Sequence, residues 1–154
     1  MKVSGSATLA APPEAVFAAI CDPGALLEVI PGCQEIHQVS ADEYRGRIAI
    51  RLPAVVGTYD TVVRLVNAEA PTSGELEGHL VGRVGTIGGR AVFHLRGEDG
   101  GTVVDYSGTG VVGGPLARLD TRFLEGFARS LVNEGLARLG RRLQPAAAER
   151  VAVR

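Results

Sequence analysis

The chain has 154 residues, of which 16 are basic and 17 acidic, so its formal net charge is −1. This length accommodates one domain with one core. The charge balance argues against a general nucleic-acid binder, which needs an excess of Lys and Arg on one surface. The composition, with 45% hydrophobic residues, is typical of a globular protein, and the apolar runs fall well short of the roughly 18 residues that a membrane-spanning helix needs. Cys21 and Cys33 are too few for a disulfide scaffold and lack metal-ligand spacing. We therefore expect a cytoplasmic protein with reduced thiols and no metal site.

The first third of the chain predicts one strand and two short helices. Residues 2–9 alternate between polar and apolar side chains, as in a half-buried strand. Two prolines then open a short helix over residues 14–21. Asp22 as the N-cap and Pro23 in the first turn begin a second short helix, which ends at Pro31.

The middle of the chain alternates as strands do and predicts six of them, separated by short turns. These strands cover residues 35–39, 44–52, 58–68, 75–83, 88–96 and 102–112. Consecutive strands joined in this way form an antiparallel meander with one covered face. With the first strand, the expected sheet has seven strands.

The last predicted element is a long helix over residues 115–143, in which Leu and Phe recur every three or four positions. It is the only element long enough to cover the sheet, so the sheet must curl around it. Its glycines (Gly126, Gly135 and Gly140) each weaken the helix and indicate either a close approach of other groups or a bend. We expect residues 1–143 to form a single domain and residues 144–154 to be a short flexible tail.

Glycines on the inner face of the predicted sheet indicate where a binding site could lie. They are Gly46, Gly78, Gly82, Gly108 and Gly110. Because a packed core fills such positions with bulky side chains, glycine there leaves either a sharply bent sheet or an open volume. An open volume would be a mostly apolar pocket. Its few polar groups could come from Tyr44, Tyr59, Thr61, Thr102 and Tyr106.

Signals for catalysis are poor. The three histidines are scattered, and the strand register places His79 and His94 on the outer face. Strand carboxylates also point outward, so no inward acid/base pair is expected. Cys33 follows a turn, where a cysteine usually acts as a small hydrophobe. The sequence predicts no catalytic residue.

Four stretches of the sequence resemble the CoxG family of carbon monoxide dehydrogenase subunits. They are Asp22-Pro23, Ile30-Pro31-Gly32-Cys33-Gln34-Glu35, Gly57-Thr58-Tyr59 and Val112-Gly113-Gly114-Pro115-Leu116-Ala117. The resemblance covers residues 2–143. That family belongs to the START-like superfamily (polyketide cyclase/Bet v 1-type, SRPBCC). The resemblance therefore implies an α+β helix-grip fold, in which a curved seven-stranded antiparallel sheet wraps around the long C-terminal helix.

The resemblance also implies a function. Family members are non-catalytic accessory proteins of molybdenum hydroxylases of the carbon monoxide dehydrogenase type. They act in maturation, membrane recruitment or electron transfer to quinone. The helix-grip cavity of relatives holds hydrophobic ligands, so a bound menaquinone, another quinone or a lipid is expected here, with no required cofactor. Many members carry a hydrophobic or amphipathic membrane-binding tail, whereas residues 144–154 are too short and too polar to anchor by themselves. Peripheral contact with the inner face of the cell membrane is a further expectation.

The expected cavity lies between the sheet and the long helix, below a lid formed by the second short helix. Its predicted lining is Tyr59, Val63, Leu80, Phe93 and Tyr106 from the sheet, and Leu119, Phe123, Phe127 and Leu131 from the helix. The predicted lid residues are Leu26, Leu27 and Ile30. Two alternatives stay open. One is a polyketide cyclase or aromatase that uses Tyr44, Tyr59 and Tyr106, and the other is a protein-interaction module whose cavity is closed.

Overall fold

The computed structural model describes residues 1–152, and the side chains of residues 1–144. Its elements are β1 (Lys2–Leu9), α1 (Pro13–Ile20), α2 (Pro23–Val29), β2 (Cys33–Gln38), β3 (Glu43–Ile50), β4 (Gly57–Glu69), β5 (Ser73–Gly82), β6 (Gly85–Glu98), β7 (Gly101–Gly113), the 3₁₀ helix η1 (Gly114–Arg118) and α3 (Thr121–Ala152).

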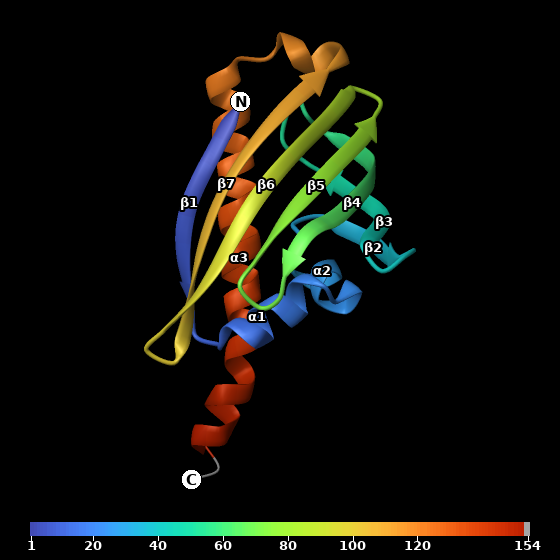
Figure 1. Ribbon diagram of the computed structural model, residues 1–154. Helices are drawn as coiled ribbons and strands as arrows, with labels where there is room; N and C mark the ends of the chain where they lie inside the picture. The colour runs from blue at the N-terminus through green and yellow to red at the C-terminus, as the bar shows by residue number, and fades with distance from the viewer. Residues whose placement is uncertain (153–154) are drawn as a thin grey trace.

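The strands form one antiparallel sheet in the order β1-β7-β6-β5-β4-β3-β2. The sheet curves around α3, as Figure 1 shows. Helices α1 and α2 lie at one end of the space between sheet and α3, which we call the lid end. The opposite end, the turn end, carries the start of β1, the β3–β4 and β5–β6 turns (residues 51–56 and 83–84) and residues 113–123. The predicted fold class is confirmed.

The start of α2 forms as its sequence predicts. The Asp22 carboxylate accepts hydrogen bonds from the backbone N–H groups of Gly24 at 3.2 Å and Ala25 at 3.3 Å, and Pro23 occupies the first turn. These contacts satisfy donors that have no partner within the helix. The cap fixes where the lid begins.

The long helix differs from its predicted bounds at both ends. Pro115 lies in η1, and the chain is extended at Leu119 before α3 begins at Thr121. Asp120 starts the helix because its carboxylate accepts from the N–H of Arg122 at 2.8 Å. At the other end α3 continues to Ala152, so Leu143 is not its end. The side chains of residues 145–154 are outside the described part of the structure, so the flexible tail over residues 144–154 stays a prediction. No helix in the described part of the chain combines the length and apolar character needed to cross a bilayer.

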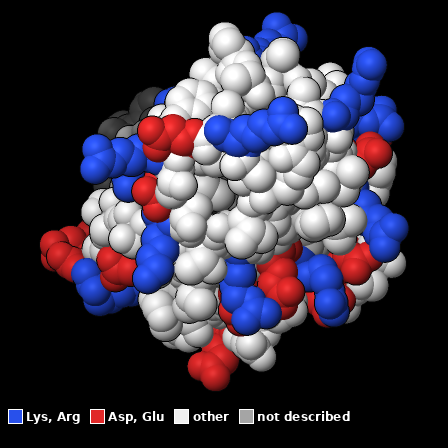
Figure 2. Space-filling view, turned by 90° about the horizontal axis from the view of Figure 1, so that it is seen from above, with Lys and Arg blue, Asp and Glu red and all other residues white. Residues whose placement is uncertain are grey.

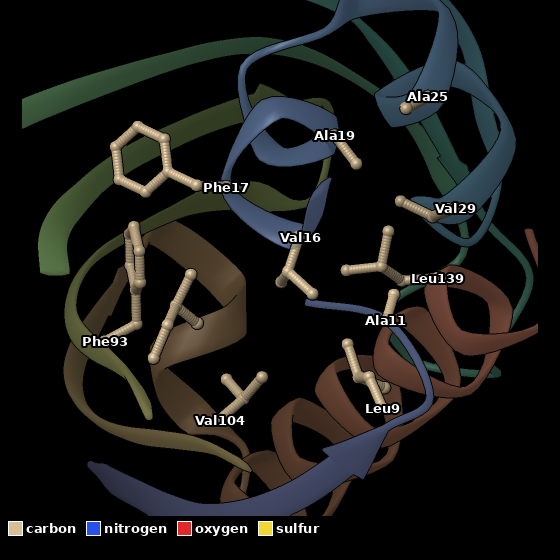
Figure 3. Packing of buried hydrophobic residues seen from close by; sticks show 11 residues of the cluster. Leu9, Ala11, Val16, Phe17, Ala19, Ala25, Val29, Phe93, Val104 and Leu139 are labelled. Atoms are coloured by element: carbon tan, nitrogen blue, oxygen red, sulfur yellow. The ribbon is translucent and has the colours of Figure 1, made fainter. Parts of the chain in front are cut away.

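Two packed clusters fill the ends of the space between sheet and helix. The lid-end core, shown in Figure 3, is formed by Leu9, Ala11, Val16, Phe17, Ala19, Ala25, Val29, Phe93, Leu95, Val104 and Leu139. The turn-end core is formed by Ile50, Val55, Tyr59 and Leu116. Since both ends are closed by well-buried side chains, any open volume must lie between them.

Candidate functional site: an apolar cavity between sheet and helix

A cavity of about 270 Å³ lies between the two cores. Its walls come from the inner faces of β5, β6, β7 and β1 and from one face of α3. The side chains that line it include Met1, Val3, Leu76, Leu80, Ile87, Ala91, Tyr106, Ala128 and Val132, and the exposed surface inside is almost wholly apolar. A concave apolar site of this kind is typical of small-molecule binding.

A second apolar chamber of about 300 Å³ lies beside the first, toward the lid. It is bounded by Ile48 and Ile50 of β3, by the end of α2 at Ile30, and by α3. Leu80 and Val132 line both chambers. These two side chains therefore form the partition between one apolar volume and the next.

The inner-face glycines divide into two groups. A Cβ built on Gly78 would meet no atom within 4 Å, so this glycine faces open space. A Cβ on Gly82 would instead come within 2.8 Å of the Tyr59 ring, and one on Gly46 within 2.0 Å of the Glu35 backbone oxygen. Glycine at those positions permits a close approach of neighbouring groups. Both interpretations of the glycine pattern hold, each at different positions.

The glycines of α3 show the same division. Gly135 lies beside the end of the lid, where a built Cβ would be 3.6 Å from the Val29 carbonyl oxygen. Gly140 lies against the Leu9 side chain at 3.3 Å, whereas a Cβ on Gly126 would have no neighbour within 4 Å. A side chain at Gly135 would therefore make an ordinary contact with the lid, and only Gly140 lies in a tight contact, with β1.

Most of the polar groups expected in the pocket are engaged elsewhere. The hydroxyl of Tyr59 donates to the Val55 carbonyl at 2.6 Å, and that of Tyr44 donates to the Cys21 carbonyl at 2.7 Å. Burial raises the pKa of both phenols. Among the five candidates, only Tyr106 lines the cavity, and its hydroxyl donates to Asn133 Oδ1 at 3.4 Å.

The remaining two candidates, Thr61 and Thr102, are buried and also bonded to backbone. Thr61 donates to the Tyr59 carbonyl at 3.1 Å, and Thr102 donates to the Ala11 carbonyl at 2.6 Å. Their hydroxyls stabilise the fold, because a buried hydroxyl without a partner would be costly. Of the five predicted polar groups, only the Tyr106 hydroxyl therefore belongs to a residue that lines the cavity.

Only some of the predicted lining residues line a chamber or groove. Leu80 and Tyr106 line the first chamber, Leu80 and Leu131 line the second, and Phe127 and Leu131 line an outer groove between β3 and α3. Tyr59 and Phe93 are buried in the two cores, Leu119 packs on the turn-end core, and Val63 is half-buried on β4. Phe123, expected on the inner face of the helix, is 40% exposed.

The three predicted lid residues also lie in different environments. Ile30 lines the second chamber together with Val29 and Pro31. Leu26 is half-buried, and Leu27 is 44% exposed on the outside of α2. The lid therefore contributes its C-terminal turn to the site.

Several lining residues on α3 were not predicted, namely Ala128, Val132, Gly135, Leu136 and Leu139. With the buried Leu124 they form a face of period near 3.6 residues. A stripe that starts at Leu124 finds them, whereas one that starts at the larger Phe123 is shifted by one residue. The small side chain of Ala128 gave no signal by hydrophobicity alone.

Residues that could support catalysis lie away from the cavity. All three histidines are exposed on the outer face, as predicted for His79 and His94. Burial raises the pKa of the Cys33 thiol, whose Sγ lies 3.4 Å from the Glu35 carbonyl oxygen, and burial also raises the pKa of Cys21. A raised pKa disfavours the reactive thiolate. Within the described residues, no group of three or more His, Cys, Asp or Glu side chains is placed to hold a metal ion.

The class of protein follows from this architecture, a helix gripped by a curved antiparallel sheet with an apolar cavity between them. The fold is START-like, of the Bet v 1 type. A START superfamily protein from Mycobacterium smegmatis matches with a TM-score of 0.74 at 13% identity, over 94% of this chain and 98% of its own. Ara h 8.0201 matches with a TM-score of 0.65 at 15% identity, over 91% and 95% of the two chains.

The family follows from the sequence. Residues 5–144 match CoxG, a family of carbon monoxide dehydrogenase subunits. The chain belongs to this family, as its motifs indicated. A conserved protein from Geobacillus kaustophilus has a similar structure, with a TM-score of 0.90 at 25% identity over 95% of this chain and 97% of its own. A comparison with the sequences of curated proteins finds no match.

Proposed function

We propose that this protein is a non-catalytic accessory protein that binds a hydrophobic ligand and serves a molybdenum hydroxylase of the carbon monoxide dehydrogenase type. The apolar cavity beside Gly78 carries the ligand-binding part of the proposal. Membership in the CoxG family supports the association with that enzyme. Within this proposal, the protein acts in maturation of the enzyme, its recruitment to the membrane or electron transfer to quinone.

The chemistry of the walls indicates the ligand class. The chambers measure about 270 and 300 Å³ and both are almost wholly apolar, so a charged or strongly polar ligand would lose its hydration without compensation. A quinone or a lipid chain fits these walls. Tyr106 lines the first chamber, and its hydroxyl would orient a quinone if it exchanged its 3.4 Å hydrogen bond to Asn133 Oδ1 for one to a quinone carbonyl.

The two alternatives from the sequence have less support. A cyclase would need several polar groups facing the substrate, but the hydroxyls of Tyr44 and Tyr59 are bound to backbone carbonyls outside the cavity. A module that only docks proteins would have a closed interior, and Gly78 instead opens onto empty space.

Native mass spectrometry of freshly purified protein, followed by organic extraction and titration with a short-chain menaquinone analogue, tests the proposal. Gly78→Leu places a side chain in the cavity. Gly88→Leu is the matched control, because a Cβ there lies on the outer face, 3.5 Å from His79 Nδ1 and 3.8 Å from Val111 Cγ2.

We expect the unmodified protein and Gly88→Leu to bind the analogue, and Gly78→Leu to lose binding while its circular dichroism is unchanged. A protein that yields no quinone or lipid and takes up none of the analogue would remove the ligand-binding part of the proposal. Co-purification with a molybdenum hydroxylase tests the partner separately.

A further inference from the structure

The arginines of this protein divide sharply by their pairing with carboxylates. Among the arginines whose side chains the structure describes, those that form ion pairs are Arg45, Arg47, Arg64, Arg90, Arg96, Arg138, Arg141 and Arg142. Within the same residues, those that form none are Arg51, Arg83, Arg118, Arg122 and Arg129. Although the formal charge of the whole chain is near zero, unpaired positive charge is therefore distributed unevenly over the surface.

Four of the five unpaired arginines lie at the turn end. Arg51 follows β3, Arg83 lies between β5 and β6, Arg118 ends η1 and Arg122 lies in the first turn of α3. All four are exposed, as is Lys2 at the start of β1. Four segments far apart in sequence thus present positive charge at one end of the molecule.

Two carboxylates close to these arginines in the sequence of the long helix, Asp120 and Glu125, are bound to backbone groups. Asp120 caps α3 by accepting from the N–H of Arg122, and Glu125 accepts from the backbone N–H of Lys2 at 2.8 Å. Neither forms a salt bridge with an arginine in the described part of the chain. These two carboxylates keep their charge, but Lys2 and the four arginines outnumber them, so the turn end has an excess of positive charge for an outside partner.

Exposed apolar side chains accompany this charge. Val56, in the β3–β4 turn, is 56% exposed, and Phe123, in the first turn of α3, is 40% exposed. Figure 2 looks down on the molecule from this end and shows Lys and Arg side chains, interspersed with Asp and Glu, around a broad uncharged surface. Large exposed apolar groups with a polar rim mark interaction sites.

We propose that the turn end binds the surface of an anionic lipid bilayer. Arginines attract anionic headgroups, and a Phe and a Val between them can enter the boundary of the acyl chains. Met1 also lies at this end and lines the cavity, so the bilayer would lie beside one wall of the apolar site. The inference assigns a surface to the membrane-recruitment part of the proposed function, on which it rests, and does not depend on which ligand the cavity holds.

Sedimentation with vesicles of phosphatidylcholine alone, or of phosphatidylcholine mixed with phosphatidylglycerol, tests the proposal. We expect binding to the mixed vesicles that weakens with salt, and little binding to phosphatidylcholine alone. Replacing Arg51, Arg83, Arg118 and Arg122 by Gln should weaken binding by about a hundredfold, given roughly fivefold for each arginine near the surface with incomplete additivity.

A matched control replaces four paired arginines, Arg45, Arg64, Arg90 and Arg96, by Gln, which changes the net charge equally. This variant should bind the mixed vesicles within a few-fold of the unmodified protein. Phe123→Ser should weaken binding several-fold without changing its salt dependence, because the Phe side chain contributes no charge.

Three results would overturn the proposal. They are no binding to mixed vesicles at low salt, equal losses in the two four-arginine variants, and binding to an immobilised acidic polypeptide with no binding to vesicles. The last result would assign the surface to an acidic protein. Gly78→Leu should bind vesicles as the unmodified protein does, so failure here is distinguishable from failure of the ligand-binding proposal.

Discussion

The two ends of the helix–sheet space and its middle are built from the same kinds of residues, yet only the ends are filled. At the lid end, Phe93 lies over Gly74, where a built Cβ would be 2.7 Å from the ring. At the turn end, Tyr59 lies over Gly82 in the same way. In the middle, Gly78 has no ring over it and faces the cavity. An inward glycine leaves space above the sheet in each case, and this space is filled only where an aromatic ring from a neighbouring strand lies over the glycine.

This difference separates stability from binding along one sheet. The filled ends supply the close packing that opposes unfolding, while the middle lacks those contacts and leaves apolar surface for a ligand. Substitutions at the ends should therefore change the free energy of unfolding. Substitutions in the middle should mainly change binding.

The largest expected effect is at the lid-end core. Phe93→Ala removes a ring that is 5% exposed and packs against Phe17 at a centroid distance of 6.1 Å. We expect a loss of about 3–5 kcal/mol in the free energy of unfolding, measured by urea denaturation. Phe123→Ala is the control and should change stability by less than about 0.5 kcal/mol, because its ring is exposed. Similar losses in both would show that the helix register is wrong.

Tyr59→Phe should have the next largest effect. The substitution removes the hydroxyl that donates to the Val55 carbonyl at 2.6 Å and leaves that buried acceptor without its partner. We expect a loss of about 1–3 kcal/mol in the unfolding free energy. Tyr106→Phe should leave stability nearly unchanged and weaken quinone binding, because this hydroxyl lies at the cavity. The opposite pattern would reverse the assignment of the two tyrosines.

Leu80→Ala should cost less, about 1 kcal/mol, because its side chain borders open volume on two sides and makes fewer packing contacts than a core leucine. Removing this half of the partition, with Val132 left in place, widens the connection between the two chambers. We expect the variant to gain affinity for longer-chain quinone analogues relative to short ones in a calorimetric titration series. An unchanged order of affinities would mean that Leu80 does not divide the site.

The smallest expected effect concerns the lid. Arg142 on α3 forms ion pairs with Asp22 and Glu28, at the two ends of α2. Exposed pairs contribute little to stability, so Arg142→Gln should leave the urea midpoint almost unchanged while ligand dissociation, followed by stopped flow, becomes faster. Arg141→Gln is the control, since Arg141 pairs with Glu134 within α3. Equal dissociation rates in the two variants would exclude a role of Arg142 in holding the lid.

The sequence predicted the fold well because its signals are local. Alternation set the strands, and Asp22 with Pro23 set the start of α2. The start of the long helix was misjudged, because Pro115 favours the first turn of a 3₁₀ helix as well as that of an α-helix.

The cavity was predicted less completely. Whether an inward glycine opens a cavity depends on rings from distant residues, as at Gly82 and Tyr59, and no local pattern reports it. The choice of Phe123 over Leu124 shifted the helix face by one residue and missed Val132. A hydrophobic face is identified from a sequence mainly by its large side chains, whereas the walls of this cavity consist mostly of small and medium ones.

The central claim is that the hollow middle, and not the packed ends, receives the ligand. Methyl NMR spectra recorded during titration with a short-chain menaquinone analogue test it most directly. The account predicts shifts at the methyl groups of Leu80, Ala91, Ala128 and Val132, with those of Val16, Val55 and Leu116 nearly unchanged. Shifts confined to exposed methyls such as those of Leu27 and Val56, or no shifts at all, would contradict it.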